Sequence, residues 1–194
     1  MDKKLYIIAG CNGAGKTTAS RRLLPSLINC TEFINADEIA FQLCPHNVES
    51  VAFLAGRMML DRVSIQFSLS KTFAIETTLS TKSYKEKVIF AQAEGYIVVL
   101  IFYWLNSVEL AIDRVKSRVL KGGHNIENQV IERRYNRGIN NLINIYLPLV
   151  NECLIFDNTN LDYELFAVKT DANSFYIINQ EKWKTLTRKN SLSR

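Results

Sequence analysis

The chain has 194 residues and a formal net charge of +5, and 47% of its residues are hydrophobic while 22% are charged. Such values are ordinary for a globular protein of one domain and allow a core of normal size. The sequence contains no run of 18 apolar residues for a membrane span, and its first apolar run is too short for a secretory signal. We therefore expect a cytoplasmic protein without a membrane partner. The positive charge suits the handling of phosphates but does not by itself indicate nucleic acid, which we do not expect as a partner.

The first strand and helix of the chain flank a glycine-rich loop. Residues 4–9 are an apolar run typical of a buried strand, and a helix is expected from Thr17 onward. Between them, residues 10–17 fit the P-loop pattern G-x-x-x-x-G-K-[ST] without a gap. The backbone N–H groups of such a loop form an anion site at the positive end of the helix. Lys16 would reach the phosphates of ATP or GTP, and the Thr17 hydroxyl would bind Mg²⁺. The predicted nucleotide-binding residues are Gly10, Asn12, Gly13, Ala14, Gly15, Lys16, Thr17 and Thr18.

Strand and helix patterns alternate along the rest of the chain, which predicts an α/β fold. We expect a P-loop three-layer sandwich with a mostly parallel five-stranded sheet, and the most apolar strand, at 96–103, in its centre. The remaining strands are predicted at 4–9, 32–35, 72–75 and 153–156. The main helices are predicted at 48–68 with Asn47 as the cap, at 83–94, at 108–120, and at 127–146, where the last ends before Pro148.

The end of the chain departs from this alternation. Residues 164–169 and 175–178 alternate weakly between apolar and polar, which indicates a small hairpin at the edge of the sheet. From 182 to 194 there are five cationic residues and no acidic one. We interpret that stretch as a solvated tail rather than an interaction arm.

Motifs that are absent narrow the choice among P-loop proteins. The strand at 97–104 ends in Leu105 and Asn106, without the carboxylate that many ATPases carry there. The N-K-x-D signature of GTPases and the L-S-G-G-Q signature of ABC ATPases are also missing. A small-molecule kinase therefore remains the preferred class.

Two acidic residues, Asp37 and Glu76, come directly after predicted strands, at the sheet edge where the P-loop lies. Ligands in such folds bind at the carboxyl ends of the strands. Asp37 is placed to accept the proton of an attacking hydroxyl, or alternatively to cap the helix that follows it. Glu76 is placed to bind acceptor hydroxyls or to support Mg²⁺, or alternatively to make a structural hydrogen bond at its strand end.

Arginines gather on two predicted helices that a Gly-Gly-His turn connects. Arg114 and Arg118 lie four residues apart and so share one helix face, and Arg134 belongs to a second cluster at 133–137. Two helices joined in this way indicate a lid that closes over a triphosphate, with some arginines offsetting charge on the transferred group. His124 at the tip of the lid is a candidate phosphate contact. For the arginines, the alternative is a solvated helical face.

Several segments together resemble the zeta-toxin-like P-loop kinases. They are 33–40 (FINADEIA), 55–57 (AGR), 73–79 (FAIETTL), 114–124 and 133–135, within a match that runs from Lys4 to about Asn158. The resemblance implies a kinase domain over residues 1–160 with a lid at about 114–137, while residues 161–194 add the hairpin and basic tail to the same domain. It also implies transfer of phosphate from ATP or GTP to the 3′-hydroxyl of UDP-N-acetylglucosamine, and an antitoxin protein as a partner.

The same resemblance assigns roles to individual residues. Asp37 would be the base, with Lys16 and Thr17 binding phosphate and Mg²⁺. Arg134 and either Arg118 or Arg114 would be lid arginines. The residues expected on the acceptor side are Glu76, Thr77, Arg57 and His124. Two other readings remain open, a kinase that acts on another nucleotide or a nucleic-acid end, and an ATP-dependent switch or binding protein.

Overall fold

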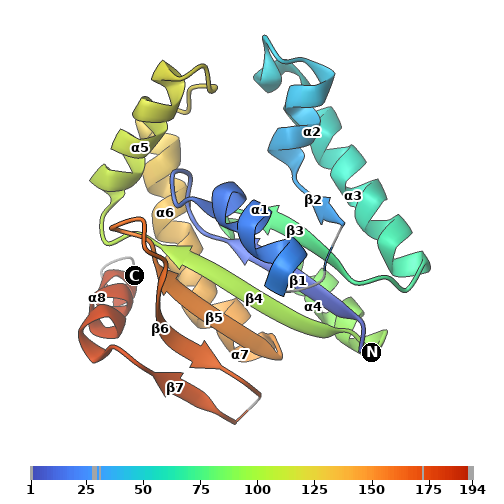
Figure 1. The fold of residues 1–194 in the computed structure, drawn as a ribbon, viewed down its shortest axis with the longest axis vertical. Coiled ribbons are helices and arrows are strands. Elements are labelled where there is room, and N and C mark those ends of the chain that lie inside the picture. Colours follow the sequence, from blue (N-terminus) through green and yellow to red (C-terminus); the bar gives the residue numbers. More distant parts are fainter. Residues whose placement is uncertain (1, 28–29, 31, 172, 192–194) are drawn as a thin grey trace.

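The computed structural model describes residues 2–27, 30, 32–171 and 173–191 (Figure 1). Within these residues seven strands form one sheet in the order β2-β3-β1-β4-β5-β6-β7. The strands from β2 to β5 in this order are parallel, whereas β6 and β7 are antiparallel to their neighbours. The strands are β1 (Lys4–Ala9), β2 (Phe33–Ile34), β3 (Phe73–Thr77), β4 (Ile97–Trp104), β5 (Glu152–Asp157), β6 (Glu164–Lys169) and β7 (Phe175–Ile177).

The α/β class and the mostly parallel sheet are confirmed, but the expected number of five strands is wrong. The predicted hairpin extends the same sheet, because β6 pairs with β5. Their register runs from Asp157 opposite Glu164 to Cys153 opposite Lys169. An exposed strand edge presents unpaired N–H and C=O groups, and the hairpin satisfies those of β5. Spacing in the sequence does not reveal which edge a hairpin joins.

The central position of β4 is confirmed. This strand pairs with β1 on one side and β5 on the other, and every residue from Val98 to Trp104 is buried. A parallel strand covered on both faces is apolar throughout rather than alternating, which is why its sequence predicted its place.

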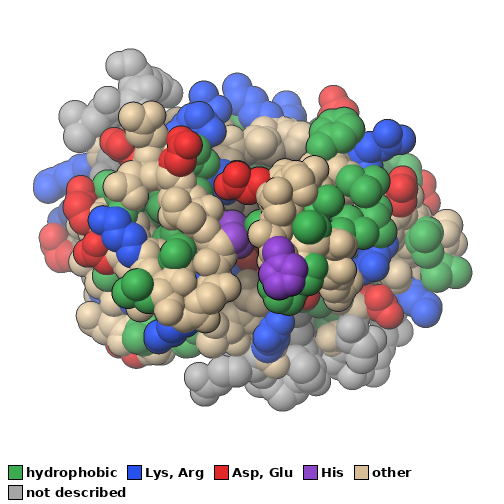
Figure 2. Space-filling view, turned by 90° about the horizontal axis from the view of Figure 1, so that it is seen from above, with side chains coloured by type: hydrophobic (Ala, Val, Ile, Leu, Met, Phe, Trp, Pro, Cys, Tyr) green, Lys and Arg blue, Asp and Glu red, His purple; other side chains and the backbone are tan. Residues whose placement is uncertain are grey.

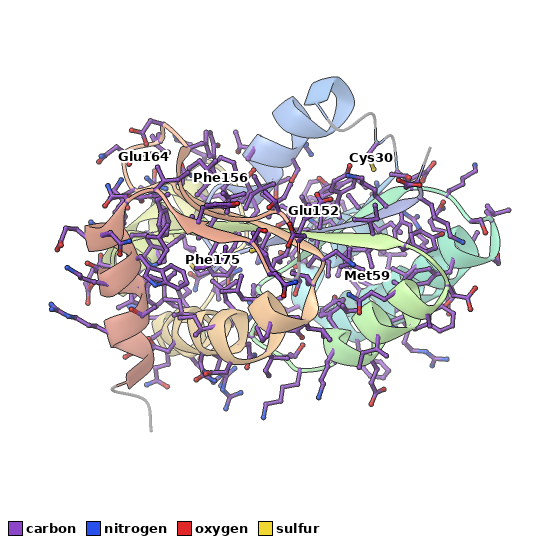
Figure 3. All side chains as sticks on the ribbon, turned by 90° about the horizontal axis from the view of Figure 1, so that it is seen from below. Cys30, Met59, Glu152, Phe156, Glu164 and Phe175 are labelled. Atoms are coloured by element: carbon purple, nitrogen blue, oxygen red, sulfur yellow. The ribbon has the colours of Figure 1, made fainter. Side chains whose placement is uncertain are left out.

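Helices cover both faces of the sheet. α1 lies on one face, while α4, α6 and α7 lie on the other (Figures 1 and 3). Within the described residues, no helix has the length and apolar character needed to cross a membrane. The helical segments are α1 (Lys16–Leu27), α2 (Ala36–Leu43), η1 (Val48–Val51), α3 (Ala52–Ser68), α4 (Tyr84–Ala93), α5 (Val108–Leu120), α6 (Asn128–Asn141), η2 (Leu142–Tyr146), α7 (Leu147–Leu149) and α8 (Gln180–Ser191).

The helix predicted at 48–68 is present as η1 and α3, and Asn47 caps its start by accepting a hydrogen bond from the Ser50 amide. The helix predicted at 127–146 continues through the π-helical turn η2 into α7, past Pro148, so its expected end is wrong. Pro148 lies in α7, directly after the π-helical turn η2, where the regular α-helical hydrogen-bond pattern is already interrupted.

The interpretation of the C-terminal stretch as a solvated tail is also wrong for its described part. Residues 180–191 form α8, in which Leu186 is fully buried and the Trp183 ring lies 5.0 Å from that of Phe175. Trp183 and Leu186 are three residues apart and therefore share one helix face, which packs inward. Residues 192–194 of the predicted tail lie outside the described residues.

Lys169 in β6 stabilises the end of α7. This buried ammonium group donates hydrogen bonds to the carbonyls of Leu147, Pro148 and Val150, at 2.9, 3.4 and 2.7 Å. Lys169→Met would leave those carbonyls without their donor, so we expect the free energy of unfolding to fall by about 2–3 kcal/mol, measured by urea denaturation. Lys184→Met, at an exposed lysine of α8, is the matched control and should change it by less than about 0.5 kcal/mol. An equal effect of both substitutions would contradict the assignment.

Candidate active site

The P-loop connects β1 to α1 and requires glycine at two of its turns. Gly13 and Gly15 have φ angles of +81° and +83°, in the left-handed region that favours glycine. A Cβ atom on Gly13 would come within 2.7 Å of the Ala111 carbonyl oxygen, and one on Gly15 within 2.5 Å of the Asn158 side-chain nitrogen. The loop is therefore packed tightly against α5 and the segment after β5, and its backbone amides have a fixed arrangement.

Lys16 and Thr17 both contact Glu76 at the start of α1. The Lys16 ammonium donates a 3.0 Å hydrogen bond to the Cys11 carbonyl and lies 3.7 Å from Glu76 Oε1. The Thr17 hydroxyl donates to Glu76 Oε2 at 2.8 Å. Burial raises the pKa of the Glu76 carboxyl, although Lys16 and Thr17 partly oppose that shift. A hydroxyl and a carboxylate side by side are oxygen ligands of the kind that Mg²⁺ prefers, so the donor set fits this ion.

Glu76 brings a carboxylate to the P-loop from β3 rather than from β4. Glu76 belongs to β3, which pairs directly with β1 in the register Ile8–Glu76. A side chain near the end of β3 can therefore reach the beginning of α1. The contact with Thr17 is a hydrogen bond at a strand end, as one of the two interpretations of Glu76 expected, and it lies at the P-loop itself.

Asp37 lies in the first turn of α2, on the other side of the cleft. The cap of α2 is Asn35, whose side chain accepts a 2.8 Å hydrogen bond from the Asp37 amide. The alternative that Asp37 caps this helix is therefore wrong. Its carboxylate remains exposed at the cleft, where it is available to a ligand.

A cleft of about 760 Å³ lies between the P-loop, α2, α5 and the loop that follows α5 (Figure 2). Figure 2 looks down on this end of the molecule, where a hollow separates two groups of side chains. The predicted site residues that line it are Asn12, Gly13, Gly15, Lys16, Thr17, Thr18, Asp37, Glu76, Arg114, Arg118 and His124. Gly10 and Ala14 lie in the same loop but do not line the cleft, and the Ala14 carbonyl accepts a hydrogen bond from Asn158.

A second cleft of about 420 Å³ adjoins the first and contains Arg134. Asp37, Val48 and His124 line both clefts, so the exposed carboxylate of Asp37 stands where they meet. Apolar side chains from α2, α3 and α6 border this second cleft. Charged groups border it as well, mainly from α6 and from the segments that precede α3 and α6.

Two residues predicted on the acceptor side do not line either cleft. Arg57 is exposed on α3. The Thr77 hydroxyl accepts a 3.0 Å hydrogen bond from the amide of Leu79, a residue with a φ of +58°. Thr77 therefore supports the strained turn after β3, which explains why a threonine at this strand end need not face a ligand.

The three arginines predicted for a lid, Arg114, Arg118 and Arg134, make contacts of different kinds. Arg114 Nη2 donates to the Thr159 carbonyl at 2.8 Å, and Arg118 Nη2 donates to the His124 carbonyl at 3.4 Å. Arg134 Nη1 donates to the Asn12 side chain at 3.2 Å and so contacts the P-loop from α6. Burial and the neighbouring Arg118 lower the pKa of His124 below its usual value, although Asp37 and Glu49 partly oppose that shift.

Sequence reasoning missed Asn158, which is fully buried behind the P-loop. Its side-chain nitrogen donates a 2.8 Å hydrogen bond to the Ala14 carbonyl, across 144 positions of sequence. The available signal was its place directly after β5, at the same sheet edge as the P-loop. His46, Phe41 and Gln42 also line the first cleft, and no motif pointed to them.

The sequence profile of the family described as AAA domain matches residues 5–138. The chain belongs to this AAA domain family. An uncharacterized protein of Haemophilus influenzae is 31% identical over 135 residues, which cover 70% of this chain and 94% of the relative.

Solved structures show the fold of this AAA-domain chain to be that of P-loop kinase-like proteins. A complex of AvrRxo1-ORF1 and AvrRxo1-ORF2 with ATP matches with a TM-score of 0.74 and 16% identity, over 96% of this chain and 64% of the other. This chain thus spans less than two thirds of that protein. The PezAT toxin–antitoxin system of Streptococcus pneumoniae matches at 0.66 and 19% identity, over 100% and 88%. A putative kinase from Chloroflexus aurantiacus matches at 0.64 and 18% identity, over 82% and 90%.

Proposed function

We propose that the protein is an ATP-dependent kinase that transfers the γ-phosphoryl group of ATP to a hydroxyl of a small molecule. One observation carries this proposal: the P-loop Lys16, the Thr17–Glu76 pair and the exposed carboxylate of Asp37 line a single cleft. Phosphoryl transfer requires phosphate binding, charge neutralisation and a residue that orients the attacking hydroxyl, and these side chains can provide all three.

The residues divide the work of the reaction. Lys16 and the P-loop amides bind the phosphates, and Thr17 together with Glu76 would hold Mg²⁺. When bound, Mg²⁺ neutralises charge on the phosphate oxygens. Asp37 accepts the proton of the acceptor hydroxyl while the oxygen of that hydroxyl forms a bond to the γ-phosphorus. The bond between that phosphorus and the bridging oxygen breaks, which leaves ADP.

The arginines of the lid offset negative charge during transfer. Arg118 lines the first cleft and Arg134 lines the second, so the two guanidinium groups border both sides of the position of Asp37. Hydroxyl acceptors need positioning and charge neutralisation more than a strong base, so we assign these arginines a share of catalysis comparable to that of Asp37.

The second cleft is evidence that the acceptor is a small molecule. It meets the nucleotide cleft at Asp37, which is where an acceptor hydroxyl must lie, and its volume of about 420 Å³ falls in the range of small-ligand sites. We infer that the acceptor is a UDP-sugar of the UDP-N-acetylglucosamine type. The support is the resemblance of the Asp37 and Glu76 segments to zeta-toxin-like kinases and the similarity in fold to the PezAT structure.

An antitoxin is the partner that this proposal implies. Both the PezAT system and the AvrRxo1-ORF1 complex with AvrRxo1-ORF2 contain a second protein, and this chain has the fold found in them. Binding of such a partner would block the nucleotide cleft or the acceptor cleft until it is removed.

Incubation with ATP, Mg²⁺ and a panel of UDP-sugars tests the proposal, with mass spectrometry detecting the gain of one phosphate. We expect phosphorylated UDP-N-acetylglucosamine from the parent protein and none from the Asp37→Asn variant. If a nucleotide or an oligonucleotide end gains phosphate in parallel reactions, that acceptor takes the place of the UDP-sugar in the proposal. A protein that does not bind ATP would contradict the proposal at its first step.

A further inference from the structure

The C-terminal helix α8 is connected to the nucleotide cleft by a chain of hydrogen bonds. Lys182, in the first turn of α8, places its ammonium nitrogen 2.8 Å from Asp157 Oδ2 and 2.6 Å from Glu164 Oε2. Asp157 ends β5 and is buried. Burial alone would raise the pKa of its carboxyl, but hydrogen bonds from Lys182 and Thr159 outweigh burial and hold this pKa below its usual value. The buried group is therefore a paired carboxylate.

The second oxygen of Asp157 fixes the segment that follows β5. Asp157 Oδ1 accepts hydrogen bonds from the Thr159 amide, at 2.8 Å, and from the Thr159 hydroxyl. The Thr159 carbonyl accepts the 2.8 Å hydrogen bond from Arg114 Nη2. Because both the amide and the hydroxyl of Thr159 are held, its carbonyl offers Arg114 an acceptor in a fixed position.

One guanidinium nitrogen of Arg114 has no hydrogen-bond acceptor within the described residues. Its Nη1 atom is buried and has no hydrogen-bond partner among the described residues, although the side chain lines the nucleotide cleft. The Arg114 stem also packs against the P-loop, since a Cβ atom on Gly13 would come within 3.2 Å of Arg114 Cβ. Buried donors normally have acceptors, and phosphate oxygens are well matched to a guanidinium group. The guanidinium is thus bound to the protein through Nη2, while Nη1 lacks an acceptor on a side chain that lines the cleft.

We propose that Lys182 and Asp157 are positioning residues that hold Arg114 in the orientation in which it binds the triphosphate. The inference rests on the proposed function, because it presumes a nucleotide in the first cleft. An unrestrained arginine samples many rotamers, and a side chain fixed before binding avoids the entropic cost of ordering it. The family match ends at residue 138, so the positioning residues Asp157 and Lys182 lie beyond it while Arg114 lies within it.

A double-mutant cycle between Lys182 and Arg114 tests this inference through the dissociation constant of ATP·Mg²⁺, measured by titration calorimetry. We expect Lys182→Met to weaken binding about five- to tenfold, Lys182→Arg to restore it to within about twofold, and Arg114→Met to weaken it about tenfold. In the Arg114→Met background the further loss from Lys182→Met should disappear, because Lys182 acts through Arg114. Circular dichroism confirms that each variant is folded, and Lys184→Met serves as the exposed control.

The outcomes separate this inference from the proposed function. Tight binding by the parent and equal binding by Lys182→Met would overturn the inference alone. Losses that multiply in the double variant would show that Lys182 supports the fold generally, and would also overturn it. If the parent itself does not bind ATP·Mg²⁺, the proposed function fails and the inference fails with it.

Discussion

Lys16→Met is expected to lower kcat/KM for phosphoryl transfer by about 1,000-fold and to weaken ATP binding about tenfold. Methionine keeps much of the length and volume of the lysine stem but removes the charge. Lys16 is the single cationic residue of the P-loop at residues 10–17, and it is buried with its nitrogen bonded to the Cys11 carbonyl. No other residue of that loop can replace its charge beside the phosphates. Steady-state kinetics and calorimetric titration with ATP·Mg²⁺ measure the two effects.

Glu76 provides an internal check on the Lys16 experiment. Lys16 is one of the groups that keep the pKa of Glu76 from rising further, so its loss favours the protonated carboxyl. A protonated Glu76 is a poorer ligand for Mg²⁺, and the variant should need a higher Mg²⁺ concentration for its residual activity. Lys184→Met, which removes an exposed lysine, should leave both constants within about twofold of the parent. Turnover of Lys16→Met within threefold of the parent would refute the assignment.

Asp37→Asn is expected to lower kcat about 100- to 10,000-fold while leaving the ATP dissociation constant within about twofold. Asparagine has nearly the same shape, so the cleft and the Asn35 cap of α2 remain, but the amide cannot accept the proton of the acceptor hydroxyl. Among the described residues, Asp37 makes no hydrogen bond or ion pair with the P-loop and lies across the cleft from it, which is why nucleotide binding should persist. Single-turnover kinetics with labelled ATP separate the chemical step from binding.

The control for Asp37 is Asp61→Asn, which changes an exposed carboxylate on α3. Removing Asp37 also removes a negative charge from the first turn of α2, where it is favourable, at a cost of about 0.3–1 kcal/mol in stability. Thermal unfolding of both variants accounts for this effect. Undiminished transfer by Asp37→Asn would show that positioning and the arginines suffice and that Asp37 is not the base.

Much of the fold follows from patterns within short stretches of sequence. The P-loop is eight consecutive residues, and its glycine positions, the lysine and the threonine need only the strand before and the helix after them. Apolar runs predicted the parallel strands and the central place of β4, because burial on both faces requires apolar residues throughout. Asp37 and Glu76 were also found locally, as the first acids after predicted strands.

The same local logic failed where partners are distant. Thr77 and Arg57 were expected on the acceptor side from the family resemblance, yet the hydroxyl of one supports a turn and the other is exposed on α3. The basic stretch from 182 looked solvated because its acidic partners, Asp157 and Glu164, lie in β5 and β6. No window of sequence contains both sides of these ion pairs.

Features set by consecutive residues could therefore be predicted from the chain alone. They are the P-loop with its lysine and threonine and an α/β scaffold that brings strand ends to one edge. The tertiary structure decided which groups meet there. Thr17 and Glu76 are 59 positions apart, Arg134 and Asn12 are 122 apart, and Asn158 and Ala14 are 144 apart. Such pairs depend on strand order and helix packing, which arise from burial summed over the whole core, so no local pattern encodes them.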